Sequence, residues 1–388
     1  MTIRLAVSAT EAETARLATN GPRRDFLELS ARVGGRVRYR DDAPRRAGLR
    51  GRLLGPHMRQ AWALAGETEP GDTLFADGEH VGLPLLAALE LRRRRPRRVV
   101  MIGHLVSRRW KLPLFALATR LGTTGTVVLH SVEQDRRLRG WIGRRWRTAL
   151  VPYQADTTFW TPSPAGDEGP PLILAVGSEN RDYDTLVRAV DGLPARVVIA
   201  AGSHWARTLA TSGELPANCE HLSQPLDFAG LRELYRRAAC VVVPLHDVAN
   251  QSGVTVMLEA MACGVPVVVT ASRGQREVTR GPLVRAAGDP DAAATADRGP
   301  QVLAPLAGGF GESGLYVLPG DARGLRRTLA MVLGDGALRD RLGAEGRRTA
   351  ERFFTLEQYV ANLAGPLGVA ESEPGGERAA AAAHGEAA

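Results

Sequence analysis

The stretch 241–270, VVVPLHDVANQSGVTVMLEAMACGVPVVVT, carries the pattern that decides the fold. A β-branched run at its start predicts a buried strand, and the polar segment after it leads to Gly253. An apolar helical pattern then runs from about Val254 to Cys263, where a glycine and a proline end it, and a second β-branched run follows. Strand, loop, helix and strand in this order predict one unit of a parallel α/β sheet.

The start of this helix has the features of an anion site. The first amides of a helix, here those of Gly253, Val254 and Thr255, have no partner within the helix, and a glycine lets a ligand come close. Glu259 lies four residues after Thr255 and therefore on the same helix face. Its carboxylate can accept two hydrogen bonds from a vicinal diol such as that of a ribose. One site would then hold phosphates and a ribose together.

An ordinary helix with Glu259 on a solvated face is the alternative to this site. The neighbouring residues argue against it, because Glu259 stands between Leu258 and Ala260 in an otherwise apolar helix. A lone acid in such surroundings usually has a dedicated partner.

Short β-branched runs alternate with helical patterns in both halves of the chain, which predicts two doubly wound α/β domains with parallel sheets. In the first half the expected strands are Ile3–Ser8, Arg36–Arg40, Thr73–Ala76, Arg98–Gly103 and Gly125–His130, with helices at Asp25–Val33 and Leu83–Arg94. In the second half they are Leu172–Val176, Arg196–Ala200, Cys240–Pro244, Val265–Thr270 and Leu315–Val317.

Composition places the domain boundary near residue 161. The stretch Thr161–Pro171 is rich in proline, glycine and acid and is typical of an exposed linker. We therefore expect an N-terminal domain at 1–161 and a C-terminal domain at 172–350. The tail 369–388 is of low complexity from residue 375 on, and we expect it to be disordered.

The chain has 388 residues, of which 44% are hydrophobic, so it is long enough for two cores of ordinary size. It contains no run of about 18 apolar residues, and its start lacks the basic and apolar regions of a signal peptide. We therefore expect a cytoplasmic protein. Cys219, Cys240 and Cys263 are widely spaced and odd in number, which favours buried thiols over disulfides or a metal site.

The net charge of +8 is unevenly distributed. Residues 1–160 hold 29 basic and 15 acidic side chains, a net charge of +14, and the remainder carries −6. Arginine-rich stretches occur at 90–98, 107–111 and 136–147, and the last two contain Trp110, Trp141 and Trp146 at helical spacing. Such a face suits peripheral contact with an anionic inner membrane surface or an acidic acceptor, and it equally fits a solvated basic face with buried tryptophans. No nucleic-acid motif accompanies the charge, so we expect no nucleic acid as a partner.

The segment SGVTVMLEAMACGVPVVV, 252–269, resembles the signature near the C-terminus of retaining glycosyltransferases of family 4, which have the GT-B fold. Other segments are similar to the family in the expected order: VPYQADTTFWTP (151–162), ILAVGSENRDYDTLVRAV (173–190), SGLYVLPGDARGLRRTL (313–329) and RRTAERFFTLEQYV (347–360). The resemblance covers roughly residues 70–365 and implies a C-terminal helix, at about 351–368, that returns to the first domain.

The resemblance assigns donor-binding roles around the helix. Glu259 matches the second acid of the family's Glu-x7-Glu motif, which binds the ribose, and Gln251 stands where the first acid contacts the donor sugar. A glutamine can still contact sugar hydroxyls, but without charge. The residues between them that are expected to bind the donor are Ser252, Gly253, Val254 and Thr255.

A loop of the second domain is expected to contact the donor phosphates. Arg181 stands where the family keeps a basic residue, whereas Ser178 stands where an arginine is commoner. A fixed cation at this point lowers the barrier, because the departing nucleoside diphosphate gains negative charge. The alternative is a surface ion pair of Arg181 with Asp182 or Asp184.

His104 ends the strand RVVMIGH, and ligands of open α/β sheets bind outside the carboxyl ends of the strands. The family keeps a histidine there that touches the donor sugar near its reacting carbon, so His104 and Arg181 are the expected catalytic residues. His130, at the end of TVVLHS, is the rival, and a structural role is open for either histidine. The resemblance also implies base contacts through the backbone of Leu222 and Ser223.

The resemblance implies an enzyme that transfers a hexosyl or related sugar from a nucleotide sugar to an acceptor that the sequence does not identify. It further implies an acceptor bound by the first domain, retention of configuration, no essential metal and no cofactor besides the nucleotide sugar substrate. Two other functions stay open: a sugar-nucleotide epimerase of the same fold, and a catalytically weak scaffold, for which Gln251 and Ser178 are the motive.

Overall fold

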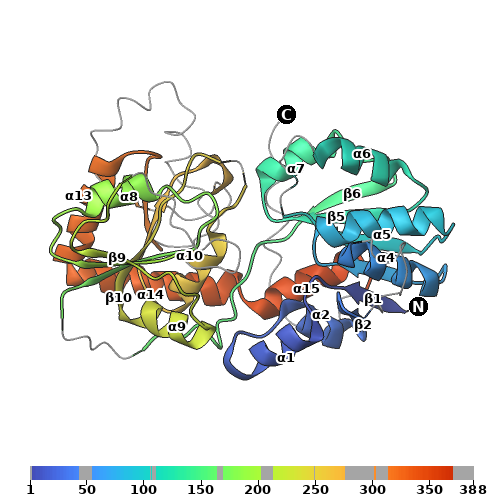
Figure 1. Ribbon diagram of the computed structural model, residues 1–388, viewed down its shortest axis with the longest axis horizontal. Coiled ribbons are helices and arrows are strands. Elements are labelled where there is room, and N and C mark those ends of the chain that lie inside the picture. Colours follow the sequence, from blue (N-terminus) through green and yellow to red (C-terminus); the bar gives the residue numbers. More distant parts are fainter. Residues whose placement is uncertain are drawn as a thin grey trace.

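The computed structural model describes residues 2–42, 55–104, 106, 111–163, 169–201, 213–248, 250–275, 301–302 and 313–369. Two α/β domains lie side by side, the first coloured blue to green and the second green to red (Figure 1). The predicted C-terminal tail from residue 370 on lies outside the described residues.

The first domain is built on a parallel sheet of six strands in the order β2-β1-β3-β4-β5-β6. Its strands are β1 Ile3–Ala6, β2 Arg36–Arg38, β3 Thr73–Ala76, β4 Arg98–Ile102, β5 Gly125–Leu129 and β6 Trp146–Leu150. Its helices are α1 Glu11–Asn20, α2 Asp25–Val33, α4 Pro56–Glu67, α5 Glu79–Leu91, α6 Leu112–Arg120 and α7 Val132–Arg139. The central strands β3 and β5 are buried along their whole length, as β-branched and apolar runs covered on both faces should be.

The second domain has a seven-stranded sheet in the order β12-β13-β11-β10-β7-β8-β9, in which only β12 is antiparallel. Its strands are β7 Leu172–Val176, β8 Arg196–Ala200, β9 Cys219–His221, β10 Ala238–Val243, β11 Val267–Thr270, β12 Gln301–Val302 and β13 Leu315–Val317. Its helices are α8 Tyr183–Val190, α9 Phe228–Arg237, α10 Val254–Ala262, α13 Ala322–Gly334 and α14 Gly336–Phe353, and a short 3-10 turn spans Arg273–Gln275. The predicted doubly wound architecture is confirmed in both domains.

The sequence pattern missed three edge strands, β6, β9 and β12. The stretch 136–147, expected to be helical, is helical only to Arg139, and its last two residues begin β6. Trp146 is buried there, and its indole Nε1 donates to the carbonyl oxygen of Thr123 at 3.1 Å. Pairing with β5 therefore decides the conformation of this arginine-rich segment. Trp141 is partly exposed, and Trp110 lies outside the described residues.

Helix α15, Leu356–Leu367, returns to the first domain, as predicted. It lies against α2 (Figure 1), and its apolar face joins the core around Phe26, Leu29 and Val100. The buried residues of that face are Leu356, Tyr359, Val360, Leu363 and Leu367. Each such side chain contributes about 1.5–3 kcal/mol when it leaves water, which holds the helix on this domain.

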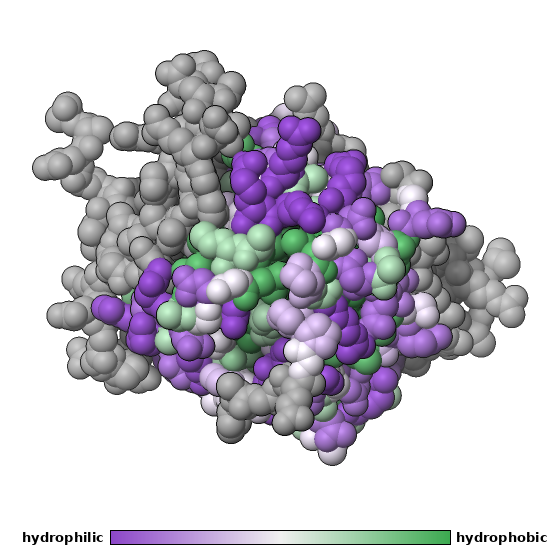
Figure 2. Space-filling view, turned by 90° about the vertical axis from the view of Figure 1, so that its left-hand side faces the viewer, coloured by the Kyte–Doolittle hydropathy of each residue, from purple (hydrophilic) through white to green (hydrophobic). Residues whose placement is uncertain are grey.

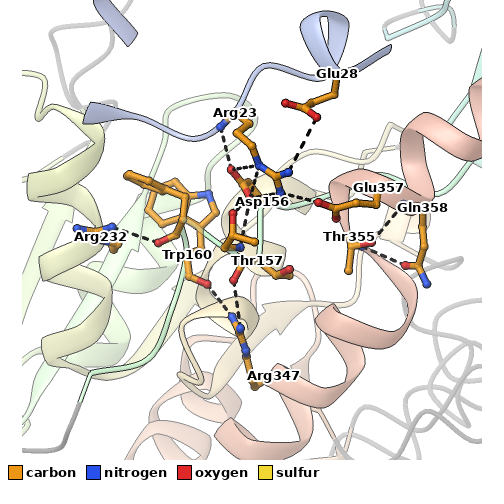
Figure 3. A network of polar contacts seen from close by, with 12 residues as sticks. Arg23, Glu28, Asp156, Thr157, Trp160, Arg232, Arg347, Thr355, Glu357 and Gln358 are labelled. Atoms are coloured by element: carbon orange, nitrogen blue, oxygen red, sulfur yellow. Dashed lines mark hydrogen bonds and ion pairs between the residues drawn. The ribbon is translucent and has the colours of Figure 1, made fainter. Parts of the chain in front are cut away.

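Two segments join the domains, and they run side by side where the amide of Ala155 donates to the carbonyl oxygen of Phe354 at 2.8 Å. Arg23, just before α2, approaches both segments (Figure 3). Its Nη2 lies 2.8 Å from Asp156 Oδ1 and 2.7 Å from Glu357 Oε1. Burial opposes ionisation of Asp156, but hydrogen bonds from Arg23 and Thr158 lower its pKa to about 2.

Arg347 of α14 holds the first crossing segment from the other side (Figure 3). Its Nη1 donates to the carbonyl oxygen of Trp160 at 2.7 Å, and its Nη2 donates to that of Thr157 at 3.1 Å. The crossing residues are thereby fixed to both domains at once.

All three cysteines are free and buried, as predicted. Among the described helices, none is both long and apolar enough to cross a bilayer. The face of the second domain that points away from the first is mainly hydrophilic, with a small hydrophobic area near its centre (Figure 2).

Candidate functional site

The N-terminus of α10 is open to a ligand. Its N-cap, Gly253, has φ of +79°, a left-handed conformation that favours glycine, and no side chain caps the helix. An added Cβ would lie 2.5 Å from Val243 Cγ1 and 3.2 Å from Arg181 Nη1. Because only a hydrogen fits there, the first amides of α10 stand directly beside the arginine. This is the arrangement in which a helix start binds an anion.

Arg181 is buried in the loop that follows β7. Its Nε donates to the carbonyl oxygen of Val176 at 3.0 Å and its Nη1 to that of Glu179 at 2.9 Å. In the part of the chain that the structure describes, no carboxylate forms an ion pair with Arg181, which excludes the predicted alternative. Asp182 instead caps α8. Burial lowers the pKa of Arg181, so an anion beside it would relieve an electrostatic penalty.

Glu259 is buried, with 8% of its surface exposed, so the solvated-face alternative is excluded. The hydroxyl of Tyr235 on α9 donates to its Oε2 at 2.9 Å. Burial raises the pKa of Glu259 to about 8, although the hydrogen bond from Tyr235 acts in the opposite direction. The expected dedicated partner is therefore a tyrosine, which the sequence pattern did not identify.

The loop before α10 is tied to the loop after β7. Ser252 Oγ accepts hydrogen bonds from the side-chain amides of Asn180 and Asn250, each at 2.7 Å. Gln251 is half-buried in the same turn, and Val254 is buried and Thr255 exposed in the first turn of α10. Asn180 has φ of +54°, so this connection holds a residue in a strained backbone conformation.

The remaining predicted donor residues lie at strand ends of the same domain. Ser178 follows β7 and is exposed. Leu222 follows β9, where its amide donates to the carbonyl oxygen of Ile199 at 2.9 Å, and Ser223 is exposed. The Leu222 amide is therefore used by the sheet, which leaves other backbone atoms for the predicted base contact.

His104 is held in place from several directions. Its amide donates to Glu79 Oε2 at 2.9 Å, and its ring Nε2 lies 2.9 Å from the carbonyl oxygen of Asp77. A carbonyl oxygen only accepts, so Nε2 carries the proton. Lys111 Nζ lies 2.5 Å from the other oxygen of Glu79. Burial alone would raise the pKa of Glu79, but the lysine and the His104 amide lower it.

His130, the rival histidine, lies close to His104, with ring centroids 6.0 Å apart. Its Nδ1 is 2.8 Å from the carbonyl oxygen of Val151, so Nδ1 carries the proton and Nε2 is an acceptor. Burial lowers the pKa of His130 to about 4, and the ring is neutral near pH 7. Within the described residues, its buried Nε2 has no hydrogen-bond partner.

Tyr153 connects the histidines with the second domain. Its ring lies edge-on to His130, with centroids 4.7 Å apart. Burial raises the pKa of Tyr153 to about 12, and the nearby side chain of Thr255 acts in the opposite direction. The structure thus brings His104, His130 and the start of α10 into one region, as the ligand rule for strand ends predicts. The sequence did not predict a site role for Tyr153, because nothing in its own segment shows that it lies near Thr255, which is 102 positions away.

Comparison with known proteins relates this chain to glycosyltransferases. Residues 170–298 match the family model described as Glycosyl transferases group 1. The chain is 28% identical over 196 residues to the lipopolysaccharide core biosynthesis glycosyltransferase LpsE of Rhizobium meliloti (strain 1021), a match that covers 48% of this chain and 46% of the relative. This chain therefore aligns with less than half of that curated relative's length.

Solved structures match over nearly the whole chain. Sucrose-phosphate synthase of Thermosynechococcus elongatus is similar with a TM-score of 0.65 at 18% identity, over 94% of this chain and 98% of that one. HepE of Anabaena, solved in complex with UDP and glucose, is similar with a TM-score of 0.61 at 15% identity, over 95% and 99% of the two chains. At such identities the likeness shows the fold, and the fold is GT-B, as predicted.

The state of His130 predicts a pH dependence of stability. Its pKa is about 4 in the folded protein and 6.5 in the unfolded chain, so the unfolded state binds more protons between these values. The part of the free energy of unfolding that depends on the neutral His130 ring is fully present above about pH 6.5. It falls as the pH is lowered, and about 3 kcal/mol of it is lost at about pH 4. We expect His130→Asn, whose amide can still donate to Val151, to lose this part of the slope.

Chemical denaturation at several pH values between these limits measures the slope. His246→Asn is the matched control, because the side chain of His246 is 63% exposed. Equal slopes in the wild type and His130→Asn would contradict the assignment of a buried neutral ring.

Proposed function

We propose that this protein is a glycosyltransferase that moves a hexosyl or related sugar from a nucleoside diphosphate donor to an acceptor hydroxyl, with retention of configuration and without a metal ion. The observation that carries the proposal is the grouping of three features at the start of α10: its open N-terminus, buried Arg181 beside it, and buried Glu259 in the turns that follow. Amides and a guanidinium suit a diphosphate, and a carboxylate one turn further suits a ribose.

The proposed chemistry needs little from the protein beyond position and charge. The bond between the anomeric carbon and the diphosphate oxygen breaks, and the acceptor hydroxyl oxygen bonds to the same carbon on the same face. The acceptor proton passes to the departing phosphate. Arg181 and the amides of α10 stabilise the charge that develops on the leaving group. His104, His130 and Tyr153 line the sugar side, where they orient the donor sugar and the acceptor.

Metal independence and retention are carried over from the family resemblance as proposals. In the described ranges, no three His, Cys, Asp or Glu side chains gather as a metal ion would require. The acceptor is proposed to bind the first domain, at the strand ends that hold Asp77 and His104. Gln251 would contact the donor sugar as an uncharged partner.

An epimerase and a catalytically weak scaffold are the competing functions, and one assay separates them. The protein is incubated with UDP-, GDP- and dTDP-sugars, with and without a panel of acceptors, and nucleotide release is followed. Transfer gives release that depends on the acceptor, epimerisation gives a changed donor, and a scaffold gives neither.

The ribose role of Glu259 predicts that Glu259→Ala abolishes measurable turnover. Loss of a charged acceptor of two hydrogen bonds should weaken donor binding by roughly 2–4 kcal/mol. Calorimetric titration with nucleoside diphosphates measures the affinity, and Glu345→Ala, which removes a surface acid paired with Arg348, is the control. Donor affinity like that of the wild type in Glu259→Ala would rule out the ribose role.

The position of Arg181 predicts a larger effect on rate than on binding. Charge on the leaving diphosphate is greatest in the transition state, so Arg181→Ala should lower turnover at saturation more than donor affinity. Arg181→Lys keeps a cation and should retain part of the rate, which separates charge from packing. Weaker donor binding with unchanged saturated turnover would mean that Arg181 only anchors the ground state.

We further propose that the first domain contacts an anionic membrane surface. Helices α5 and α6 pack together, and they carry the exposed residues Leu91 (73%), Leu114 (45%) and Leu117 (65%). The arginine-rich stretch 92–98 follows Leu91 directly. Apolar side chains beside arginines are the combination that binds a headgroup layer.

This surface predicts recruitment by anionic lipid, with about 1 kcal/mol from each arginine near the surface. Co-sedimentation with vesicles that contain or lack phosphatidylserine, at low and high salt, measures it, because salt screens the attraction. The double variant Leu114→Ser/Leu117→Ser should pellet less than the wild type. Pelleting that is equal with and without anionic lipid, or absent in both, would rule out the membrane contact.

A further inference from the structure

Tyr235 is the side chain that completes the surroundings of Glu259. The tyrosine is fully buried near the end of α9, and its hydroxyl lies 2.9 Å from Glu259 Oε2. Burial, with Glu259 next, raises the pKa of Tyr235 well above its usual value, so the hydroxyl stays protonated and donates. A carboxylate has about four lone-pair sites, so this bond leaves the carboxylate able to accept two more hydrogen bonds.

The ring of Tyr235 is held by the segment that crosses between the domains. Trp160 lies edge-on to it, with ring centroids 5.5 Å apart. Arg236, the next residue of α9, donates from Nε to the carbonyl oxygen of Thr161 at 2.8 Å and from Nη2 to its Oγ1 at 2.6 Å. Arg347 fixes the carbonyl group of Trp160 from α14 (Figure 3). The hydroxyl is therefore presented from a fixed ring.

We infer that Tyr235 is a positioning residue, which holds one oxygen of Glu259 so that the other faces the ribose hydroxyls of a nucleoside diphosphate. This inference rests on the proposed function, because it gives Glu259 the ribose as its ligand. The hydrogen bond stabilises the ionised carboxylate, which is the form that accepts two hydrogen bonds from a diol. Without it, the pKa of a carboxyl group in so apolar a place would be higher still, so the form that accepts two hydrogen bonds would be harder to reach.

Other groups face this pair but do not replace the hydroxyl. Cys263 is the C-cap of the helix that carries Glu259. Glu259 affects the pKa values of Tyr153 in the crossing segment and of Cys263, and the charge of Arg181 in the β7 loop affects that of Tyr235. Arg181 binds backbone carbonyl oxygens instead of Glu259. The pH dependence of ligand binding therefore reports chiefly on Glu259 and Tyr235.

A double-mutant cycle tests the inference, with UDP and GDP as probes in calorimetric titration. Tyr235→Phe should weaken binding of the nucleotide that the wild type binds by about tenfold, the effect of one hydrogen bond to a charged group. In a Glu259→Gln background the same change should have little further effect, because the two side chains act as one unit. Additive effects would overturn the inference, since they would show that Tyr235 acts on the ligand or the fold by another route.

The pH profile is the second readout. In the wild type, nucleotide affinity should rise with pH as Glu259 ionises, with a midpoint at about pH 8. Removal of the Tyr235 hydroxyl should move this midpoint to higher pH. The affinities of the two proteins should therefore differ less at about pH 9 than at about pH 7. Parallel profiles would count against the inference. Tyr39→Phe, which removes one hydroxyl from the first domain, is the control, and thermal unfolding of each variant checks that it is folded.

Nucleotide binding by the wild type tests the proposed function, and the effects of the Tyr235 and Glu259 variants on that binding test the positioning role. A wild-type protein that binds neither nucleotide overturns the proposed donor site and the role of Tyr235 with it. A wild-type protein that binds one of them, together with independent effects at Tyr235 and Glu259, overturns the positioning role alone.

Discussion

The ion pair between Arg23 and buried Asp156 is the contact on which the arrangement of the two domains depends. It joins the start of α2 to the first crossing segment, and the same guanidinium reaches Glu357 at the start of the returning helix. Removal of Arg23 would leave the buried carboxylate of Asp156 without its main partner. Because the Arg23 side chain is 35% exposed, solvent screening keeps the cost below the roughly 3–5 kcal/mol of a fully buried pair. The segment held in this way also carries Tyr153, which lies near Thr255, and Trp160, which packs on Tyr235. The domain junction and the wall of the site are therefore one piece of structure.

The positive groups around the site would be balanced by an anionic ligand. Arg181 and the open end of α10 present positive charge that no carboxylate of the described residues neutralises. On the opposite side, His130 is kept neutral by burial, and His104 is occupied by backbone groups. Glu259 is the exception, a buried acid that a tyrosine hydroxyl helps to ionise. In the proposed function, a nucleoside diphosphate would supply the diphosphate for the cation and the diol for the acid, and would offset part of the cost of burying both groups.

Prediction from sequence succeeded where burial alone decides the structure. Strands β3, β7, β8 and β13 have the predicted bounds, because apolar and β-branched runs in a covered sheet have few other stable conformations. Strand β6 was missed, since WRTAL has neither alternation nor a β-branched run, and it becomes a strand by pairing with β5 at the edge of the sheet. The predicted start of α5 at Leu83 was four residues late, because Gly78 and Glu79 give no capping pattern that marks the observed start.

The family resemblance implied the returning helix and the place of Arg181. The residues by themselves determined the two doubly wound domains and the position of Gly253 and Glu259 at one helix start. Each of these follows from local patterns, in which period, glycine placement and isolated charge act within one strand–loop–helix unit. Only the tertiary structure decided that Tyr235 binds Glu259, that Tyr153 lies near Thr255, and that Arg181 has carbonyl groups rather than Asp182 as partners. Most of these contacts join residues that lie on different elements of the fold. They depend on crossing angles, side-chain directions and loss of water, which no single segment of sequence specifies.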